Sequence, residues 1–384
     1  MESTEMKQKS GRLVSLDAFR GFDMMMIIGF DAMMWELGRW IYGGPNWLTT
    51  QFSHPQWYGL SFYDCIFPTF LFIAGLSFPF SYARQVEKGL RSLTIHLRIF
   101  KRAAILIALG WVIDGPILKV GFSESLRYGS VLGKIGLGSM LAALYYVHFR
   151  RYTRIFICAG LIVGYAVLLN LIVAPDFPNS SPFSVEGNFI GWLDRLSTPG
   201  KLSCGGTVNG VHYPSLCEAS GLYVTFFAAA TAMLGTFAGE IVRSTRFSGA
   251  RKALHLVLMA AGLFVAGLVM LRFVPLSKKL WSPSFMLLVG SGSTAVFALF
   301  YYLADVRMWR GWTTFFTVIG LNSITVYMLF HIFDFYGASR FFLGGISAQV
   351  ANPSGAAFVV NCGAFALAWL AMFFLYCKKT FLKV

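Results

Sequence analysis

"FSHPQWYGLSFYDCIFPTF" occupies residues 52–70 and places a histidine, a tryptophan and an aspartate at the threshold of a strongly apolar run. The run continues to about residue 82, and about 20 mainly apolar residues are enough for a helix to cross a bilayer. Titratable side chains are costly at that depth and usually serve a function there. The stretch therefore predicts a membrane-embedded fold with a functional role for His54 and Asp64.

The composition of the whole chain agrees with a polytopic membrane protein. Of its 384 residues, 56% are hydrophobic and 13% charged, and the mean hydropathy is +0.63. Soluble domains are roughly 45–50% apolar and about 25% charged. The formal net charge of +15 could indicate a nucleic-acid partner, but the basic residues are scattered between apolar segments. The excess of positive charge on cytoplasmic loops explains them better, so we expect no nucleic-acid partner.

Apolar runs along the chain predict an all-α fold of about ten spanning helices. We expect them at residues 19–38, 58–82, 99–118, 130–148, 155–174, 220–241, 253–272, 284–303, 313–332 and 357–376. Placing the N-terminus inside puts 22 of the 32 Lys and Arg residues on internal segments or at their edges. This bias predicts that both termini face the cytoplasm.

The spans leave room for one domain, residues 1–384, with a cytoplasmic segment at 1–18 and a long external loop at 175–219. The first apolar segment is long and has no small-residue cleavage site, so we expect no removable signal peptide. Cys204 and Cys217 share the long loop and can pair if it faces an oxidising space. The chain has no CxxC cluster, so we expect no metal.

Ionisable residues gather in the outer half of the predicted bundle. Asp31 lies about 18 Å beyond Phe19 along the first helix, slightly past the midplane. Asp64 lies about 9 Å below the outer end of the second helix. His54 precedes that helix on an external segment and can overhang the same cavity. Lys134 lies near a helix end, from which its ammonium group can extend to the membrane surface.

These residues form patterns that resemble the heparan-α-glucosaminide N-acetyltransferase family. The resemblance begins with "RLVSLDAFRG", includes "LRYGSVLGKIGL", and ends with "KKLWSPSF" and "GLNSITVY". Its longest pattern is H-x-x-W-x-G-L-x-x-x-D-x-x-F-P-x-F-x-F-I-x-G, which starts at His54 and ends at Gly75. The matches span positions 12 to about 327 in the family's order, so the resemblance is specific.

The resemblance implies a transmembrane acyltransferase. Such an enzyme takes acetyl-CoA from the cytoplasm and acetylates the amine of a glucosamine-type sugar on the other side. Bacterial relatives that lack the large lumenal domain have about this length. The resemblance to them implies the bacterial inner membrane as the location. Dimerisation is implied in the same way. The family's catalytic histidine falls on His54, whereas its active-site asparagine falls on Asp31, a departure that leaves an anion to hold an ammonium substrate or to orient His54.

Acetyl transfer to an amine requires a base, because an ammonium has no lone pair with which to attack a thioester. A histidine, whose ordinary pKa is about 6.5, can accept that proton near neutral pH. We expect His54 to be this base, supported by Asp64 and Asp31, with Trp57 and Asp31 contacting the sugar. We expect six residues to lie on the coenzyme side, namely Arg20, Asp17, Lys101, Arg102, Asn322 and Ser323. Asn322 is also a candidate donor to the thioester's developing oxyanion.

Several alternatives stay open at this point. Membrane-embedded carboxylates, many glycines and Pro68 are also typical of a proton-coupled amino-sugar transporter. A scaffold without activity is a third possibility. Within the acyltransferase hypothesis, acetyl-CoA can react directly in a ternary complex, which we favour, or through an acetylated His54. The acceptor can be free glucosamine, an oligosaccharide or a cell-wall fragment, and O-acetylation is a further option.

Overall fold

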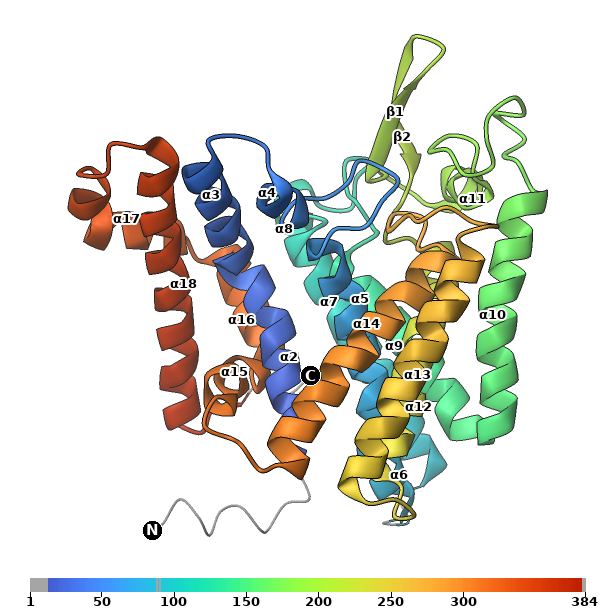
Figure 1. Ribbon diagram of the computed structural model, residues 1–384. Helices are drawn as coiled ribbons and strands as arrows, with labels where there is room; N and C mark the ends of the chain where they lie inside the picture. The colour runs from blue at the N-terminus through green and yellow to red at the C-terminus, as the bar shows by residue number, and fades with distance from the viewer. Residues whose placement is uncertain (1–12, 88, 90, 382–384) are drawn as a thin grey trace.

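The structure is a computed structural model that describes residues 13–87, 89 and 91–381. It is a bundle of helices (Figure 1). Among the described residues, seven helices are long and apolar enough to cross a membrane, and an eighth crossing results if one bent pair counts as a span. The prediction of an all-α polytopic membrane protein is confirmed. Residues 1–12 of the predicted cytoplasmic segment lie outside the described residues.

The seven candidate spans lie close to predicted ones. The second predicted span is Tyr63–Tyr82, formed by η2 (Tyr63–Cys65), α5 (Ile66–Leu76) and α6 (Phe78–Glu87). The other six begin with α9 (Val131–His148), α10 (Arg151–Leu171) and α12 (Leu222–Arg243). They continue with α13 (Gly249–Met270), α14 (Pro283–Tyr301) with η3 (Tyr302–Val306), and α18 (Pro353–Cys377).

The other three predicted spans are helical but irregular. The first is broken into α2 (Val14–Met25), a π-helical turn η1 (Met26–Phe30) and α3 (Asp31–Tyr42), because Gly29 takes a left-handed φ of 101°. The third, α7 (Ser92–Ile113), starts earlier than predicted and includes basic residues. The ninth is the bent pair α15 (Thr313–Gly320) and α16 (Ser323–Ile332), whose axes differ by 71°.

The long loop at 175–219 contains regular structure that was not predicted. It contains α11 (Phe189–Ser197) and an antiparallel hairpin of β1 (Cys204–Val208) and β2 (Val211–Cys217). Short helices α4 (Trp47–Gln51) and α8 (Ile117–Val120) and the longer α17 (Phe335–Ser347) complete the described elements. In Figure 1 the hairpin, α11, α4, α8 and α17 all lie at one end of the bundle, and α6 lies at the other. The segments predicted to be external therefore share one end.

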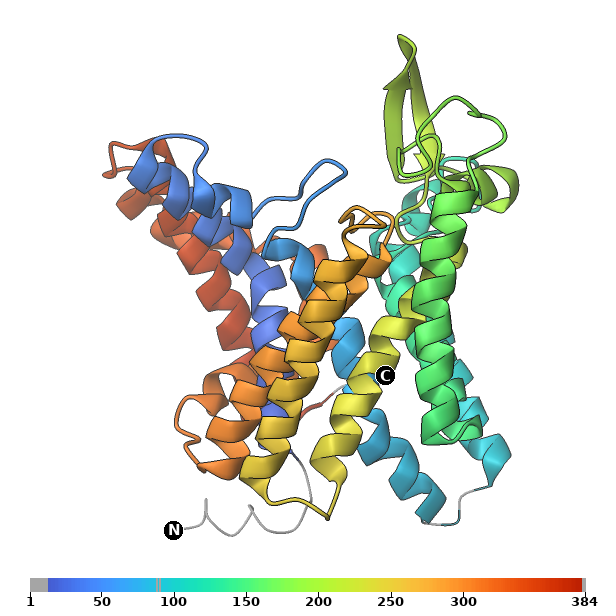
Figure 2. The same ribbon diagram turned by 45° about the vertical axis from the view of Figure 1, so that its right-hand side comes forward.

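Helix α5 is the centre of the bundle. Its span is 78% buried over its most apolar window, against 22% for α13, so α5 is enclosed and α13 presents most of its surface to lipid. Helices α2, α9, α12 and α14 all contact α5. Figure 2 shows α2, α3 and α18 on one side of the molecule and α10 on the other.

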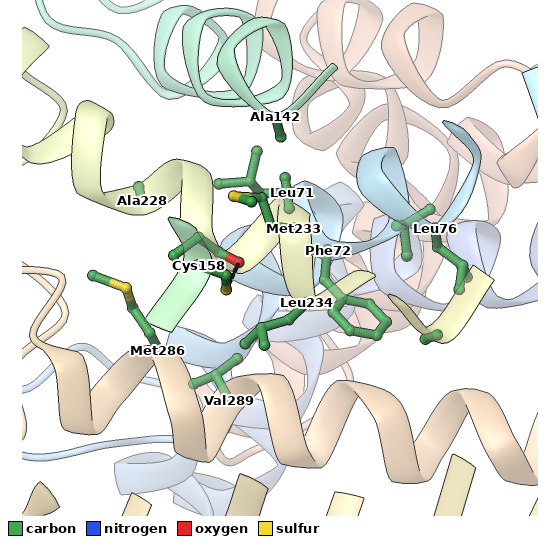
Figure 3. Close-up of a cluster of buried hydrophobic side chains, with 14 of the residues drawn as sticks. Leu71, Phe72, Leu76, Ala142, Cys158, Ala228, Met233, Leu234, Met286 and Val289 are labelled. Carbon is green, nitrogen blue, oxygen red and sulfur yellow. Dashed lines mark hydrogen bonds between the residues drawn. The ribbon is translucent and has the colours of Figure 1, made fainter. Parts of the chain in front are cut away.

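Glycines allow the central helices to approach closely. A Cβ at Gly75 would collide with the carbonyl of Ala232, and one at Gly235 with that of Phe72. Small residues at helix crossings are typical of membrane bundles, where packing rather than water drives association. Figure 3 shows the apolar cluster around this crossing, where Leu71 and Phe72 of α5 lie near Met233 and Leu234 of α12. The crossing holds α5, and therefore Asp64 at its outer end, in a fixed position.

Candidate active site

His54 lies on the irregular segment between α4 and α5. Asn46 starts the preceding helix with a capping box, and its side chain accepts hydrogen bonds from the backbone N–H groups of Leu48 and Thr49. Further along, Trp57 Nε1 donates to the carbonyl of Phe183 at 2.7 Å, which ties the segment to the long external loop. The histidine side chain remains 52% exposed. It is therefore anchored on both sides and still accessible.

Asp64 faces His54 from the first turn of the span. The 3₁₀ turn η2 places it there, and its backbone N–H donates to the carbonyl of Ser61 at 3.1 Å. Its carboxylate Oδ1 is 2.7 Å from His54 Nδ1, and the side chain is only 2% exposed. A carboxylate can only accept, so Nδ1 carries the hydrogen and Nε2 of the neutral ring is left as the basic nitrogen.

A lysine completes the group. Lys278 Nζ is 3.0 Å from Asp64 Oδ1 and 3.5 Å from His54 Nδ1. It comes from the loop between α13 and α14, and the two loops are joined where Gly59 N–H donates to the carbonyl of Leu276 at 2.9 Å. Burial lowers the pKa of the Lys278 ammonium, while the neighbouring Asp64 opposes that shift.

Asp31 reaches this group through Tyr63. The tyrosine hydroxyl is hydrogen-bonded to the Asp31 carboxylate, and the Tyr63 ring lies 4.7 Å from the His54 ring, centroid to centroid. Of the three titratable residues predicted to converge, His54 and Asp64 contact each other directly. Asp31 is linked to them only through Tyr63. Asp31 is not among the residues that line the cavity described next.

A cavity of about 460 Å³ opens beside the His54–Asp64 pair. Its lining includes Trp57, Tyr63, Lys278, Lys279 and Trp281, together with residues from distant parts of the chain. These distant residues are Asp114, Arg127, Ser203, Cys204, Ala219, Ser220, Tyr327 and His331. We call this space the outer cavity. Its volume is within the range of small-molecule sites.

An apolar neck leads inward from the outer cavity. It has a volume of about 20 Å³, and Ile27, Phe67, Val131 and Tyr327 border both spaces. Phe70, Ser323 and Ile324 border both the neck and a third space of about 180 Å³, which we call the inner cavity. The shared lining shows that the three spaces follow one another through the bundle.

Two arginines line the inner cavity. Arg20 comes from α2 and Arg102 from α7, and Ser77, Gly320 and Ser323 also border the space. Ser323 is the first residue of α16, so the bend between α15 and α16 points a helix N-terminus here. Backbone N–H groups at a helix N-terminus favour anions, as do arginines. The inner cavity is therefore suited to phosphate groups.

One wall of the outer cavity is held by an ion pair. Arg127 donates to both carboxylate oxygens of Glu218, at 2.7 and 3.0 Å, and Glu218 also accepts from the backbone N–H groups of Ser203 and Ser220. Lys134 supports the same wall from behind: it is 1% exposed, donates to the carbonyl of Ala219 at 2.9 Å and lies 3.7 Å from the Trp281 ring. The prediction that this side chain can extend to the membrane surface was wrong, because the side chain is enclosed, with Nζ bonded to a carbonyl and lying over an aromatic ring.

Two titratable groups near this wall have shifted pKa values. Burial raises the pKa of Asp194, on α11, to about 7. A hydrogen bond with Cys217 lowers the pKa of the Cys204 thiol to about 6. The two cysteines lie opposite each other on the two strands of the hairpin, and both carry free thiols. Cys204 also lines the outer cavity.

The residues predicted to lie on the coenzyme side only partly come together. Arg20, Arg102 and Ser323 line the inner cavity, with Asp17 3.5 Å from Arg20. Lys101 is exposed on α7 and is not among the residues that line that cavity. Asn322 is buried at the bend and donates to the carbonyl of Thr380 at 3.0 Å, so its amide lies on the inner side, away from His54.

Comparison with known proteins agrees with the motifs. Residues 12–187 match the family model described as heparan-alpha-glucosaminide N-acetyltransferase, catalytic. The human protein of that name is 24% identical over 97% of this chain and 60% of its own length. The mouse protein is 23% identical over 98% of this chain and 61% of its own length. The chain is similar in sequence to the heparan-α-glucosaminide N-acetyltransferases. It spans about three fifths of the length of these curated relatives.

The match to this acetyltransferase family covers much of the described site. His54, Asp64, Arg20, Arg102 and Arg127 all lie within residues 12–187. Lys278 lies beyond that range, and sequence reasoning gave it no role. One signal was present: Lys278 begins "KKLWSPSF", on a segment predicted to be external like that of His54. Tyr63 was also missed, because nothing in the sequence distinguishes it from the many aromatic packing residues.

Proposed function

We propose that the chain is a transmembrane acetyltransferase, which moves the acetyl group of acetyl-CoA to the amine of a glucosamine-type sugar across the bilayer. The observation that carries this proposal is the succession of cavities between the two arginines and the His54–Asp64 pair. The relatives' names support the reaction class.

The shape and chemistry of the cavities suit acetyl-CoA. Its phosphates fit beside Arg20, Arg102 and the N-terminus of α16, where charge-assisted hydrogen bonds are available. Its pantetheine arm is long and thin, which suits the narrow neck between Phe67 and Val131. The thioester would then enter the outer cavity from within, while the sugar arrives from the other face.

The reaction in the outer cavity is a direct transfer. The sugar amine attacks the thioester carbonyl, and the new C–N bond forms as the C–S bond breaks. His54 Nε2 takes the proton that the amine loses and returns it to the departing thiolate of the coenzyme. Asp64, at 2.7 Å from Nδ1, fixes the ring and stabilises its charged form. Tyr63, which is hydrogen-bonded to Asp31, packs its ring against the imidazole.

The test uses purified protein with acetyl-CoA and glucosamine. The account predicts release of coenzyme thiol that depends on glucosamine, and mass spectrometry of the product separates N- from O-acetylation. His54→Ala should lower the rate by roughly 10²- to 10⁴-fold while the protein stays folded. A folded His54→Ala protein with unchanged transfer would refute the proposal. Uptake of glucosamine without thiol release would favour a transporter instead.

A further inference from the structure

We propose that Lys278 is a positioning residue whose ammonium group keeps the His54 imidazole in the neutral form that can accept the substrate's proton. The inference rests on the proposed acetyl transfer and deepens it. It concerns a residue of the loop between α13 and α14 that contacts both members of the His54–Asp64 pair.

The geometry places two potential cations on one carboxylate oxygen. Asp64 Oδ1 is 2.7 Å from His54 Nδ1 and 3.0 Å from Lys278 Nζ. When His54 is neutral, the oxygen accepts one hydrogen bond from each neighbour and its charge is balanced by Lys278. When His54 is protonated, a second positive charge lies 3.5 Å from the first. A like charge at that distance disfavours the charged ring, so Lys278 offsets the effect that Asp64 alone would have.

Lys278 also selects the tautomer of the neutral ring. An ammonium group has only donors, so it leaves Asp64 as the sole acceptor for the Nδ1 hydrogen in this group. By drawing Asp64 Oδ1 into two hydrogen bonds, it holds the carboxylate against the ring. Nε2 is then the nitrogen with the lone pair.

The structure holds Lys278 in place through an unusual loop. Trp281 has a left-handed φ of 49°, and its backbone N–H donates to the carbonyl of Lys278 at 2.9 Å. The backbone N–H of Ser277 donates to Ser282 Oγ at 3.1 Å, and Tyr165 donates to the carbonyl of Leu280 at 2.6 Å. A non-glycine residue in this conformation persists only where its surroundings over-determine it. The loop is therefore built to fix the residues that it carries.

Other charged groups near His54 are engaged elsewhere or lie farther from the ring. Asp31 acts through Tyr63, and Arg127 is paired with Glu218. Asp114 accepts from the backbone N–H of Val131 at 2.8 Å. Lys279 and His331 line the same cavity, and neither is within hydrogen-bond distance of Asp64 in the described structure. Lys278 is thus the cation that contacts both members of the pair.

The test compares Lys278→Met with Lys278→Arg in the full-length protein. Removing the Lys278 charge should move the acidic limb of the pH profile of kcat/KM to higher pH by about one unit. The reason is that Asp64 then stabilises the imidazolium with no opposing cation beside it. The arginine variant keeps the charge and should keep the limb in place. Lys279→Met is the matched control, since it removes a neighbouring cation from the same cavity and should also leave the limb in place.

A second readout does not depend on activity. Diethyl pyrocarbonate reacts with the neutral imidazole and not with the protonated one. The pH dependence of His54 modification, followed by peptide mass spectrometry, should therefore shift to higher pH in Lys278→Met. Absence of transfer in the wild type would refute the proposed function, while the modification profile would still decide the role of Lys278. A folded Lys278→Met protein whose two profiles match the wild type would overturn the inference. The inference would also be overturned if the pH profiles of Lys278→Arg shifted as far as those of Lys278→Met.

Discussion

Asp64 is the residue on which the proposed chemistry depends most after His54. Its carboxylate contacts His54 and Lys278 and is almost fully buried. We expect Asp64→Asn to lower kcat/KM by roughly 10²- to 10⁴-fold, because a neutral amide neither stabilises an imidazolium nor enforces the Nδ1–H tautomer. Steady-state kinetics on protein that elutes as a single species measures the effect. Activity within twofold of the wild type would show that His54 does not need this partner.

Asp194 predicts a pH dependence of stability. Its pKa in the folded protein is about 7, against 3.8 for an ordinary aspartate, because the side chain is buried. The folded state therefore holds this proton more tightly than the unfolded state does. The stabilisation is complete below about pH 4, declines as the pH rises, and is lost above about pH 7, by about 4 kcal/mol in total.

Asp194→Asn should remove this slope. Asparagine has no proton to lose, and its amide oxygen can keep the hydrogen bond from the Glu218 backbone N–H, which is 3.0 Å long in the wild type. The apparent unfolding temperature between pH 5 and 8 provides the comparison. Equal slopes in the two proteins would mean that Asp194 is already ionised in the fold.

At the scale of elements, the crossing of α5 and α12 sets the position of the site. Gly235→Ala places a methyl group against the carbonyl of Phe72, and we expect it to cost about 1–3 kcal/mol. Gly262→Ala on α13 is the matched control, since a Cβ there meets nothing within 4 Å. The apparent unfolding temperature of the two variants in detergent decides the point. Equal unfolding temperatures for Gly235→Ala and Gly262→Ala would contradict the close approach of α5 and α12.

The hairpin offers a second prediction at this scale. Cys204 and Cys217 are paired across β1 and β2, and the low pKa of Cys204 makes it the attacking thiolate. We expect oxidised glutathione to form a disulfide between them, with the glutathione accepting the two electrons. The gain in stability should be about 2–3 kcal/mol.

Thiol counts under denaturing conditions should fall by two on oxidation, and peptide mass spectrometry should identify the cross-link. Cys204→Ser should abolish both changes. Mixed disulfides with glutathione on separate cysteines, without the cross-link, would contradict the opposed arrangement.

At the scale of the whole molecule, the sequence predicts what depends on local composition. The apolar runs, the placement of polar segments at one end and the nearness of His54 to Asp64 all follow from residues close together in the chain. Lys278 could not be placed in this way, because its contact with Asp64 joins residues 214 positions apart. The side chain of Lys134 was misplaced because its partners, the carbonyl of Ala219 and the Trp281 ring, are both distant in sequence.

Irregular backbone was also beyond the sequence pattern. The break at Gly29 and the bend before Ser323 interrupt runs whose hydrophobicity is continuous. The hairpin at Cys204–Cys217 depends on strand pairing within the long external loop, which the apolar runs do not predict. The bend matters for the proposed function, because it directs the N-terminus of α16 at the inner cavity.

The central claim is that a donor bound beside Arg20 and Arg102 reaches His54 through the neck. A density map of the protein with acetyl-CoA tests it most directly. The account predicts phosphates beside the two arginines and the thioester in the outer cavity, within contact of His54. Acetyl-CoA lying wholly on one side of the neck, with its thioester away from His54, would contradict the account.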